Sequence, residues 1–438
     1  MRFTHSLNIA FMTQPNSTQR VEQALERAAA AADLNLFAYL DAENALAQAA
    51  QLDRETAQGQ WRGPLHGLPV TIKDLFNVAG MPTRAGAKAK MPPLQPAEAI
   101  AVARLRAAGA VILGKTNMVE IALGITGENP WTGDVKNPLD PTRQTGGSSS
   151  GSAAAVAAGV GTLSLGTDTA GSIRIPSALC GVVGFKPTFG LVPLDGALPL
   201  CWSCDHAGPI TRTVNEAATM FEVLAKQTPK LTKLNGANLR FGVPYRYLEG
   251  ALSDEVRQVW EQFLRTLSAG GATLVAMDMD DIFKRTIDVF VPLRAESSIT
   301  HRHALASEPE HFSPFVRSEL ERGMKVTAVD YLDALALQNQ LRSEADLALR
   351  DVDALILPAT PTIAQPRGST EIMLESGRTT LRAGFMHLAR PFSLLGLPTL
   401  SMPFAKIGAL PAGLQIVTPT GTDWHTLSIG QRLEEIEN

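Results

Sequence analysis

Cysteine is scarce in this chain, whose 438 residues include only three, Cys180, Cys201 and Cys204. So few cysteines exclude the disulfide framework that holds small secreted proteins together. The pair in CWSC has the spacing of a redox or zinc motif. No second CxxC or HxxxH completes a zinc site, and the segment has the character of a loop rather than of a helix start. We interpret the cysteines as structural, with redox or zinc chemistry as the alternative.

The chain also lacks a strong net charge and long apolar runs. Its formal net charge is -4, so it has no concentrated basic surface for nucleic acid or for an anionic membrane. No apolar run approaches the roughly 20 residues that span a bilayer. The first 20 residues have a broken apolar stretch that does not fit a secretory signal, and Met12 is an alternative start. We expect a cytoplasmic protein.

Helical and strand-like segments alternate through the first half of the chain. Amphipathic or Ala-rich patterns predict helices, and short apolar, β-branched runs bounded by Gly or Pro predict buried strands. The expected helices are 20–32, 43–59, 97–109 and 152–159, and the expected strands are 68–72, 111–113 and 159–168. Residues 126–144 are rich in turn formers and predict a long loop. This alternation predicts an α/β fold.

From about residue 236 the sequence becomes more charged and helical. Residues 253–270 predict an amphipathic helix with Ser253 as N-cap and Gly270 as stop, between strands at 238–244 and 272–279. Three further strands are expected at 353–360, 397–404 and 413–417. Without a repeat or a long polar linker, the chain predicts one large domain. We expect an N-terminal helical segment, 1–60, on a core, 61–438, in which 236–351 is more variable and helps to shape the substrate pocket.

Lys73 and Ser172 are candidate catalytic residues. Lys73 follows the apolar run 68–72; a lysine there usually keeps its ammonium in water, but burial would lower its pKa towards that of a useful base. Ser172 lies in LGTDTAGSIRIPSALCG, where small residues let a turn present several N–H groups together, as an oxyanion hole requires. A serine nucleophile needs a base, and this stretch has no histidine. A phosphate-binding nest is the alternative for this segment.

The run GGSSSGS, residues 146–152, has the composition of a flexible linker. Together with its neighbours, however, it resembles the amidase signature family, serine hydrolases with a Ser-Ser-Lys triad. The resemblance rests on GLPVTIKDLFNVAGMPTRAG, GGSSSGSAAAVAAG, LGTDTAGSIRIPSALCGVVGFKPT and GPITRTV, and continues more faintly to about residue 415. Ser148 and Ser172 are 24 residues apart, as are the family's first GGSS serine and its nucleophile.

The resemblance implies a fold and a set of roles. The fold is a single large domain with a central, mixed, twisted β-sheet covered by helices on both faces. Ser172 is the expected nucleophile, Ser148 follows a cis peptide bond and bridges Ser172 to Lys73, and neutral Lys73 is the expected base. The backbone N–H groups expected to form the oxyanion hole are those of Thr169, Ala170, Gly171 and Ser172. The residues expected to support the site are Ser149, Thr167, Asp168 and Arg174.

One position departs from the family, which often has Gly-Gly before the nucleophile where this chain has Ala170-Gly171. If position 170 needs a positive φ, alanine adds strain of about 1 kcal/mol.

The expected function is amide hydrolysis of a small molecule, with no cofactor, metal, nucleic acid or membrane; a homodimer is compatible with it. One alternative is the amidase subunit of a larger assembly, either a tRNA-dependent amidotransferase or a biuret- or allophanate-type hydrolase. Another is a non-catalytic, Gly-rich, anion- or nucleotide-binding module. Hydrolysis by the purified chain alone would separate these alternatives.

Overall fold

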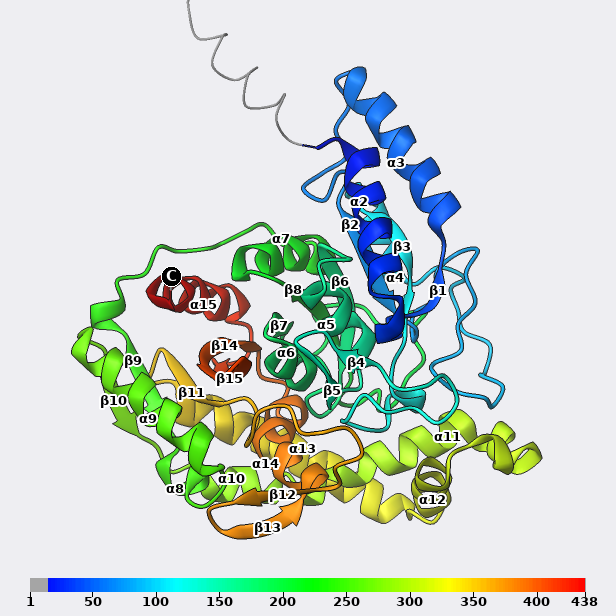
Figure 1. The fold of residues 1–438 in the computed structure, drawn as a ribbon. Helices are drawn as coiled ribbons and strands as arrows, with labels where there is room; N and C mark the ends of the chain where they lie inside the picture. Colours follow the sequence, from blue (N-terminus) through cyan, green and yellow to red (C-terminus); the bar gives the residue numbers. More distant parts are fainter. Residues whose placement is uncertain (1–14, 438) are drawn as a thin grey trace, which may run out of the picture.

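Strands from both halves of the chain form one mixed sheet through the centre of the molecule (Figure 1). The structure is a computed structural model that describes residues 15–437. Across the 11-stranded sheet the order is β1 (Phe37–Leu40), β3 (Val111–Thr116), β2 (Pro69–Lys73), β6 (Leu163–Asp168), β8 (His206–Thr211), β7 (Val183–Lys186), β14 (Thr399–Ile407), β15 (Leu410–Val417), β11 (Ala354–Pro358), β9 (Arg240–Val243) and β10 (Thr273–Ala276). The predicted α/β class and the sharing of one sheet by distant segments are confirmed.

Two parallel neighbouring strands of this sheet, β2 and β6, bring together candidate site residues that are far apart in the sequence. Val70 pairs with Leu163 and Ile72 with Leu165. Because the carboxyl ends of parallel strands meet at one edge, Lys73 at the end of β2 and Asp168 at the end of β6 lie at the same edge of the sheet.

Alternate side chains of the strands are buried on opposite faces of the sheet. In β3, Ile112 belongs to the large core, whereas Val111 and Leu113 pack in a second cluster with the N-terminal helices. A strand buried on both faces has little need for polar residues, which explains the apolar runs in the sequence.

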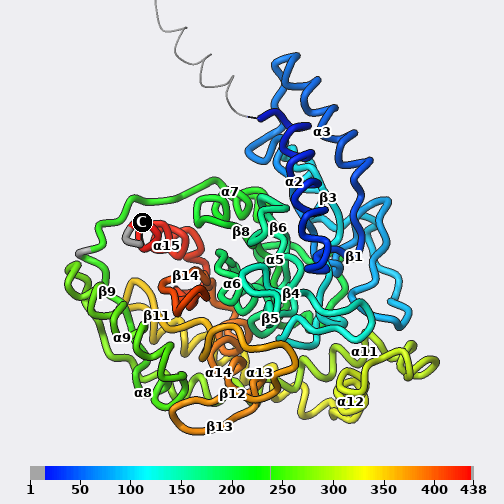
Figure 2. The backbone as a smooth tube through the Cα atoms, viewed as in Figure 1, coloured from blue at the N-terminus to red at the C-terminus, as the bar shows by residue number. Residues whose placement is uncertain are grey.

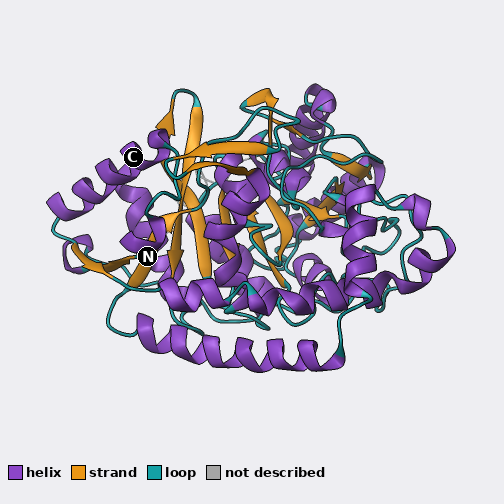
Figure 3. Cartoon of the chain, turned by 90° about the horizontal axis from the view of Figure 1, so that it is seen from below, coloured by secondary structure: helices purple, strands orange, loops and turns teal. Residues whose placement is uncertain are grey.

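Helices surround the sheet (Figure 3). Within residues 15–437 they are α2 (Ser17–Ala30), α3 (Ala42–Ala57), α4 (Ile100–Ala107), α5 (Ser150–Ala157), α6 (Arg174–Cys180), α7 (Val214–Ala225), α8 (Tyr245–Leu248), α9 (Asp254–Ala269), α10 (Asp280–Arg285), α11 (Val291–Ser307), α12 (Pro314–Gly323), α13 (Ala328–Leu349), α14 (Leu381–Leu394) and α15 (Asp423–Glu437). None of these described helices is both long and apolar enough to cross a membrane.

Side-chain caps mark the starts of two helices. The Asn16 side chain accepts a hydrogen bond from the Gln19 N–H, 2.8 Å, and so begins α2. Ser253 caps α9 as predicted, accepting from Val256. Helices α2 and α3 pack against each other at one end of the molecule (Figure 2). The predicted alternative start, Met12, lies outside the described residues.

Three predicted segments differ from the structure. The N-terminal segment 1–60 also contributes an edge strand, β1, which pairs with β3. The predicted loop 126–144 contains a small hairpin, β4 (Lys136–Asn137) and β5 (Asp140–Gln144). The predicted loop after CWSC becomes strand β8, because its backbone pairs with both β6 and β7. Strands β1 and β8 depend on partners distant in sequence, so local pattern did not show them, whereas β4 and β5 are neighbours in sequence.

Candidate active site

Lys73 is fully buried at the end of β2 and points at two hydroxyl groups. Its Nζ lies 2.8 Å from Ser148 Oγ and 2.7 Å from Thr167 Oγ1, with the Thr167 carbonyl oxygen at 3.5 Å. The structure therefore brings together Lys73, Ser148 and Thr167, three residues that the sequence places in different segments.

Burial lowers the pKa of Lys73 to about 7, although the negative charges of Asp168 and Asp205 oppose the shift. Above that pH the side chain is a neutral amine, with two N–H donors and one lone pair. The two oxygens of Thr167 can accept both hydrogens. The lone pair is then available to the Ser148 hydroxyl, so the site can hold a buried base.

The Gly/Ser run is a buried, tightly fixed segment and not a linker. Its Gly147–Ser148 peptide bond is cis, as predicted, and Ser148 and Ser149 are fully buried. A Cβ on Gly151 would lie 2.5 Å from the Asn117 carbonyl oxygen, so only glycine allows α5 this close approach. The small residues are needed because the backbone passes between other backbone segments.

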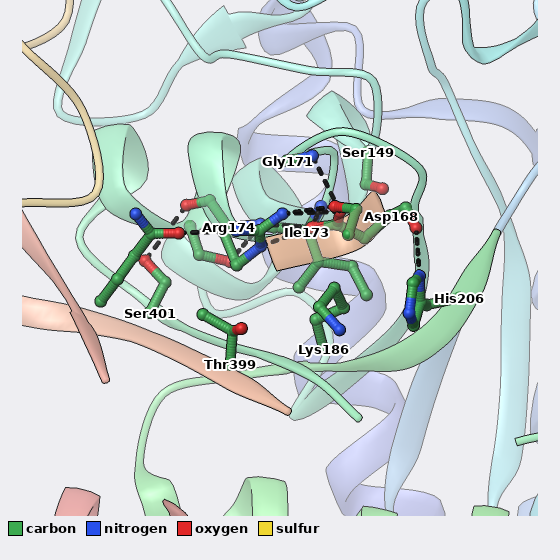
Figure 4. A network of polar contacts seen from close by, with 12 residues as sticks. Ser149, Asp168, Gly171, Ile173, Arg174, Lys186, His206, Thr399 and Ser401 are labelled. Atoms are coloured by element: carbon green, nitrogen blue, oxygen red, sulfur yellow. Dashed lines mark hydrogen bonds and ion pairs between the residues drawn. The ribbon is translucent and has the colours of Figure 1, made fainter. Parts of the chain in front are cut away.

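The loop between β6 and α6 is wound around the carboxylate of Asp168 (Figure 4). Asp168 accepts hydrogen bonds from the Gly171 N–H at 2.8 Å and the Ile173 N–H at 3.1 Å. It also forms a buried ion pair with Arg174, 3.0 Å from Oδ2 to Nε. Burial alone would raise the pKa of Asp168, but the charge and hydrogen bonds of Arg174 hold it well below its usual range. The carboxylate fixes the shape of the loop that carries Ser172.

The Asp168–Arg174 pair is tied to the C-terminal part of the chain. Arg174 Nη1 donates to Gln415 Oε1 at 2.6 Å, and the Ser393 hydroxyl donates to Asp168 Oδ1 at 2.7 Å. A buried ion pair is stable only when its remaining donors and acceptors are also satisfied. Here α14 and β15 supply those partners, so the far end of the chain holds the loop in place.

Ser172 lies at the turn into α6 and is 7% exposed. Its carbonyl oxygen accepts a hydrogen bond from the Ser149 N–H at 3.2 Å. The Ser149 hydroxyl in turn donates to the Thr167 carbonyl at 3.1 Å. These bonds join the Gly/Ser run to the Ser172 loop. The Lys73 half of the predicted bridge is formed; among the described residues no hydrogen bond joins the Ser148 and Ser172 side chains.

The positive φ near the nucleophile falls on Gly171, at +121°, and not on Ala170. Alanine at position 170 therefore does not add the backbone strain that a positive φ would cause. The backbone N–H of Gly171 was expected to form part of the oxyanion hole. It instead donates a hydrogen bond to Asp168. Thr169, Ala170 and Ser172 are the remaining N–H candidates.

Gly171→Ala is expected to lower the free energy of unfolding by about 2 kcal/mol. A Cβ there would lie 2.6 Å from the Ala389 Cβ and 2.7 Å from Ile175 Cδ1. Urea unfolding measures the loss. The matched control is Gly190→Ala, where φ is +82° but nothing lies within 4 Å, so only the backbone cost of about 1 kcal/mol remains. Equal losses would contradict the close approach.

Sequence reasoning missed Asp205, which braces the Ser172 loop from the other side. The Thr169 hydroxyl donates to Asp205 Oδ1 at 2.5 Å, and the N–H groups of Leu200 and Cys201 donate to Oδ2. Burial raises the pKa of Asp205 to about 6. The antiparallel pairing of Asp168 with His206 places Asp205 beside Thr169, a contact that only the sheet register could show.

The CWSC segment is a turn leading into β8, with both cysteines buried and Trp202 exposed. The Cys204 N–H donates to the Cys201 carbonyl at 2.9 Å. Burial raises the pKa of both thiols, which makes them poor nucleophiles and poor ligands at neutral pH. Within residues 15–437 no group of three or more His, Cys, Asp or Glu side chains could hold a metal ion.

Known proteins resemble this chain over nearly its whole length. The family model described as Amidase matches residues 19–427. The chain is 35% identical to AtzE, a 1-carboxybiuret hydrolase subunit of Pseudomonas sp. (strain ADP), covering 92% of this chain and 91% of that protein. It is also 35% identical to a glutamyl-tRNA(Gln) amidotransferase subunit of Burkholderia pseudomallei (strain 668), covering 92% and 90%.

A solved structure described as a crystal structure of amidase superposes with a TM-score of 0.94, at 50% identity and with complete coverage of both chains. The predicted fold class and the predicted hydrolysis of amide C–N bonds are thereby confirmed. The chain belongs to the amidase family, the amidase signature enzymes that its sequence resembles.

Proposed function

We propose that this chain is a self-sufficient amidase that hydrolyses a small carboxylic amide, in the cytoplasm, through an acyl-enzyme on Ser172. The observation that carries the proposal is the buried Lys73, whose Nζ lies 2.8 Å from Ser148 Oγ. A fully buried lysine that forms no ion pair with another described residue would cost a great deal unless its neutral form is used.

In the proposed reaction Ser172 Oγ attacks the amide carbonyl carbon while its proton passes to Ser148. Ser148 passes its own proton to neutral Lys73. The relay then reverses and protonates the nitrogen of the leaving group, because an amide expels ammonia or an amine poorly unless that nitrogen is protonated. Water attacks the acyl-enzyme through the same relay and releases the carboxylic acid.

The developing oxyanion needs preorganised donors, each of which is typically worth about 10²–10³ in kcat. We assign this role to the backbone N–H groups of Thr169, Ala170 and Ser172. Asp168 and Asp205 hold the loop that presents them, through Gly171 and Thr169 respectively. Asp168, Asp205 and Arg174 thus act as positioning residues.

The similarity to subunits of larger enzymes supports a second candidate. In that case the chain needs a partner protein before it turns over an amide. The purified chain should be assayed with short aliphatic, aryl and urea-type amides, with ammonia or amine release as the readout. Turnover by the chain alone supports the self-sufficient enzyme; turnover only after a partner is added would replace it by the second candidate.

Ser148→Ala is expected to reduce kcat by about 10²- to 10⁴-fold, the usual contribution of a positioned proton-transfer group. The nucleophile remains, so more activity should survive than after loss of Ser172. Steady-state assays with one amide measure both. The control is Ser150→Ala. Ser150 lies in the same Gly/Ser segment, and its buried hydroxyl has no hydrogen-bond partner among the described residues. Full activity in Ser148→Ala would remove Ser148 from the relay.

A further inference from the structure

Helix α14 presents one face to the catalytic loop. A Cβ on Gly171 would lie 2.6 Å from Ala389 Cβ, and Ser393 donates to Asp168 at 2.7 Å. Positions 382, 386, 389 and 393 share this face, because helix neighbours recur every three or four residues. In Figures 1 and 2, α14 lies beside α6. Arg382 therefore stands on the same helix face as the contacts to the nucleophile loop.

An apolar cluster connects Arg382 with the residues next to the nucleophile. Met386, one turn from Arg382, packs in the cluster that includes Ala170 and Ile125. Phe290 packs against this cluster, and the Arg294 guanidinium carbon lies 6.0 Å from the Phe290 ring centroid. The apolar cluster that contains Ala170, two residues before Ser172, is thus bordered by an arginine side chain.

Arg382 and Arg390, both on α14, have no direct ion-pair partner among the described residues. Within 15–437 neither forms an ion pair or a hydrogen bond, and Arg390 Nε is buried without a partner. Burial lowers the pKa of both groups. At Arg382 the negative charge of Glu319 opposes this shift, whereas the positive charges of Arg294 and Arg390 add to it. The nearby carboxylate, Glu319, is already held by Arg294 at 3.2 Å and by Arg322 at 2.8 Å.

Arg174, which is fully buried, contrasts with Arg382, which is partly buried. Arg174 is held by Asp168, Gln415 and Ser393, as a buried guanidinium requires. Arg382 instead has the ring of Phe315, 5.1 Å from its guanidinium carbon. A ring over the guanidinium plane fixes its orientation but leaves the in-plane N–H donors free, in the fork that matches a carboxylate.

We propose that Arg382, assisted by the charge of Arg390, binds a carboxylate on the acyl side of the substrate, so that this enzyme acts on short amides that carry a second, ionised acid group. The proposal rests on the amidase function proposed above. Arg382 and Ala389 are seven residues apart, about 10 Å along a helix. A short dicarboxylic acid monoamide fits this separation.

The test compares charged and neutral amides of equal length: succinamate with butanamide, glutaramate with pentanamide, and adipamate with hexanamide. In at least one pair the wild-type kcat/KM should favour the charged amide. Arg382→Gln should lower that preference by about 10- to 100-fold, mainly through KM, as expected for loss of a charge-assisted hydrogen bond. Arg382→Lys should restore part of it, because the charge returns without the fork.

The control is Arg378→Gln, an arginine with 69% side-chain exposure on β13 (Gly377–Thr380) that pairs with Glu371 at 3.3 Å. It should leave the preference unchanged. A wild-type enzyme that hydrolyses neutral amides with no preference for charged ones, or an Arg382→Gln variant that slows both members of a pair equally, would overturn the carboxylate site and leave the amidase function standing.

If the wild-type chain hydrolyses no amide, calorimetry can still test the carboxylate site separately from the proposed amidase function. The binding of glutaramate and of pentanamide to Ser172→Ala is measured. Binding of glutaramate that Arg382→Gln removes from this variant would support the carboxylate site, even though self-sufficient hydrolysis had failed. Absence of binding by both compounds would overturn the carboxylate site together with the proposed function.

Discussion

Ser172→Ala is expected to reduce kcat by about 10⁴-fold or more with every amide tested, since no other group can replace the nucleophile. The change removes one oxygen, and the Ser172 hydroxyl forms no hydrogen bond with another described residue. The fold should therefore be unaffected. Initial rates of ammonia release measure the loss, and thermal unfolding monitored by circular dichroism confirms that the variant is folded.

The matched control for this variant is Ser268→Ala, at an exposed position near the end of α9. It should retain wild-type kcat and KM. Catalytic-triad variants of other enzymes keep far less than about one hundredth of the wild-type rate. If Ser172→Ala kept more than that, Ser172 would not be the nucleophile.

Lys73→Met is expected to reduce kcat by about 10³- to 10⁴-fold, because the relay then has no final proton acceptor. Methionine keeps most of the length of the side chain and removes only the amine. In the wild type, the pKa of about 7 means that Lys73 is protonated and inactive at low pH. The wild-type kcat/KM should therefore rise as the pH increases through about 7, and the variant should lack this rise.

The stability of Lys73→Met provides its control. Burial depresses the lysine pKa from 10.5 to about 7, so the folded state binds fewer protons than the unfolded chain between these values. The resulting loss of stability is absent above pH 10.5, grows as the pH falls, and is constant below about 7. At neutral pH the variant should unfold at a temperature no lower than the wild type. An inactive variant that was also unfolded would leave the role of Lys73 to be tested with Lys73→Gln.

The sequence was most informative where spacing and chemistry coincide. The alternation of helical and strand-like segments was sufficient to predict the α/β class. The contact between Lys73 and Ser148 was implied by the resemblance to the amidase signature family, to which the separation of Ser148 and Ser172 contributes. Both depend on strands whose pattern is strong because they are buried on two faces. The cis bond before Ser148 was also predicted and is present.

Residues that act through tertiary contacts could not be predicted. Asp205 reaches Thr169 only because β8 pairs with β6, and Ser393 reaches Asp168 only because α14 packs beside α6. The CWSC motif indicated the two cysteines, whereas the residue that contacts the Ser172 loop is Asp205, which follows them. Arg382 gave no local signal either; only the structure shows that it forms no ion pair with another described residue.

The most direct measurement of the central claim is the mass of the enzyme during turnover of an aryl amide, quenched within the first cycle and mapped by peptide. We expect one acyl group on the peptide that contains Ser172, formed together with one equivalent of released amine. Amine release without an acylated peptide, or an acyl group on a peptide without Ser172, would contradict it.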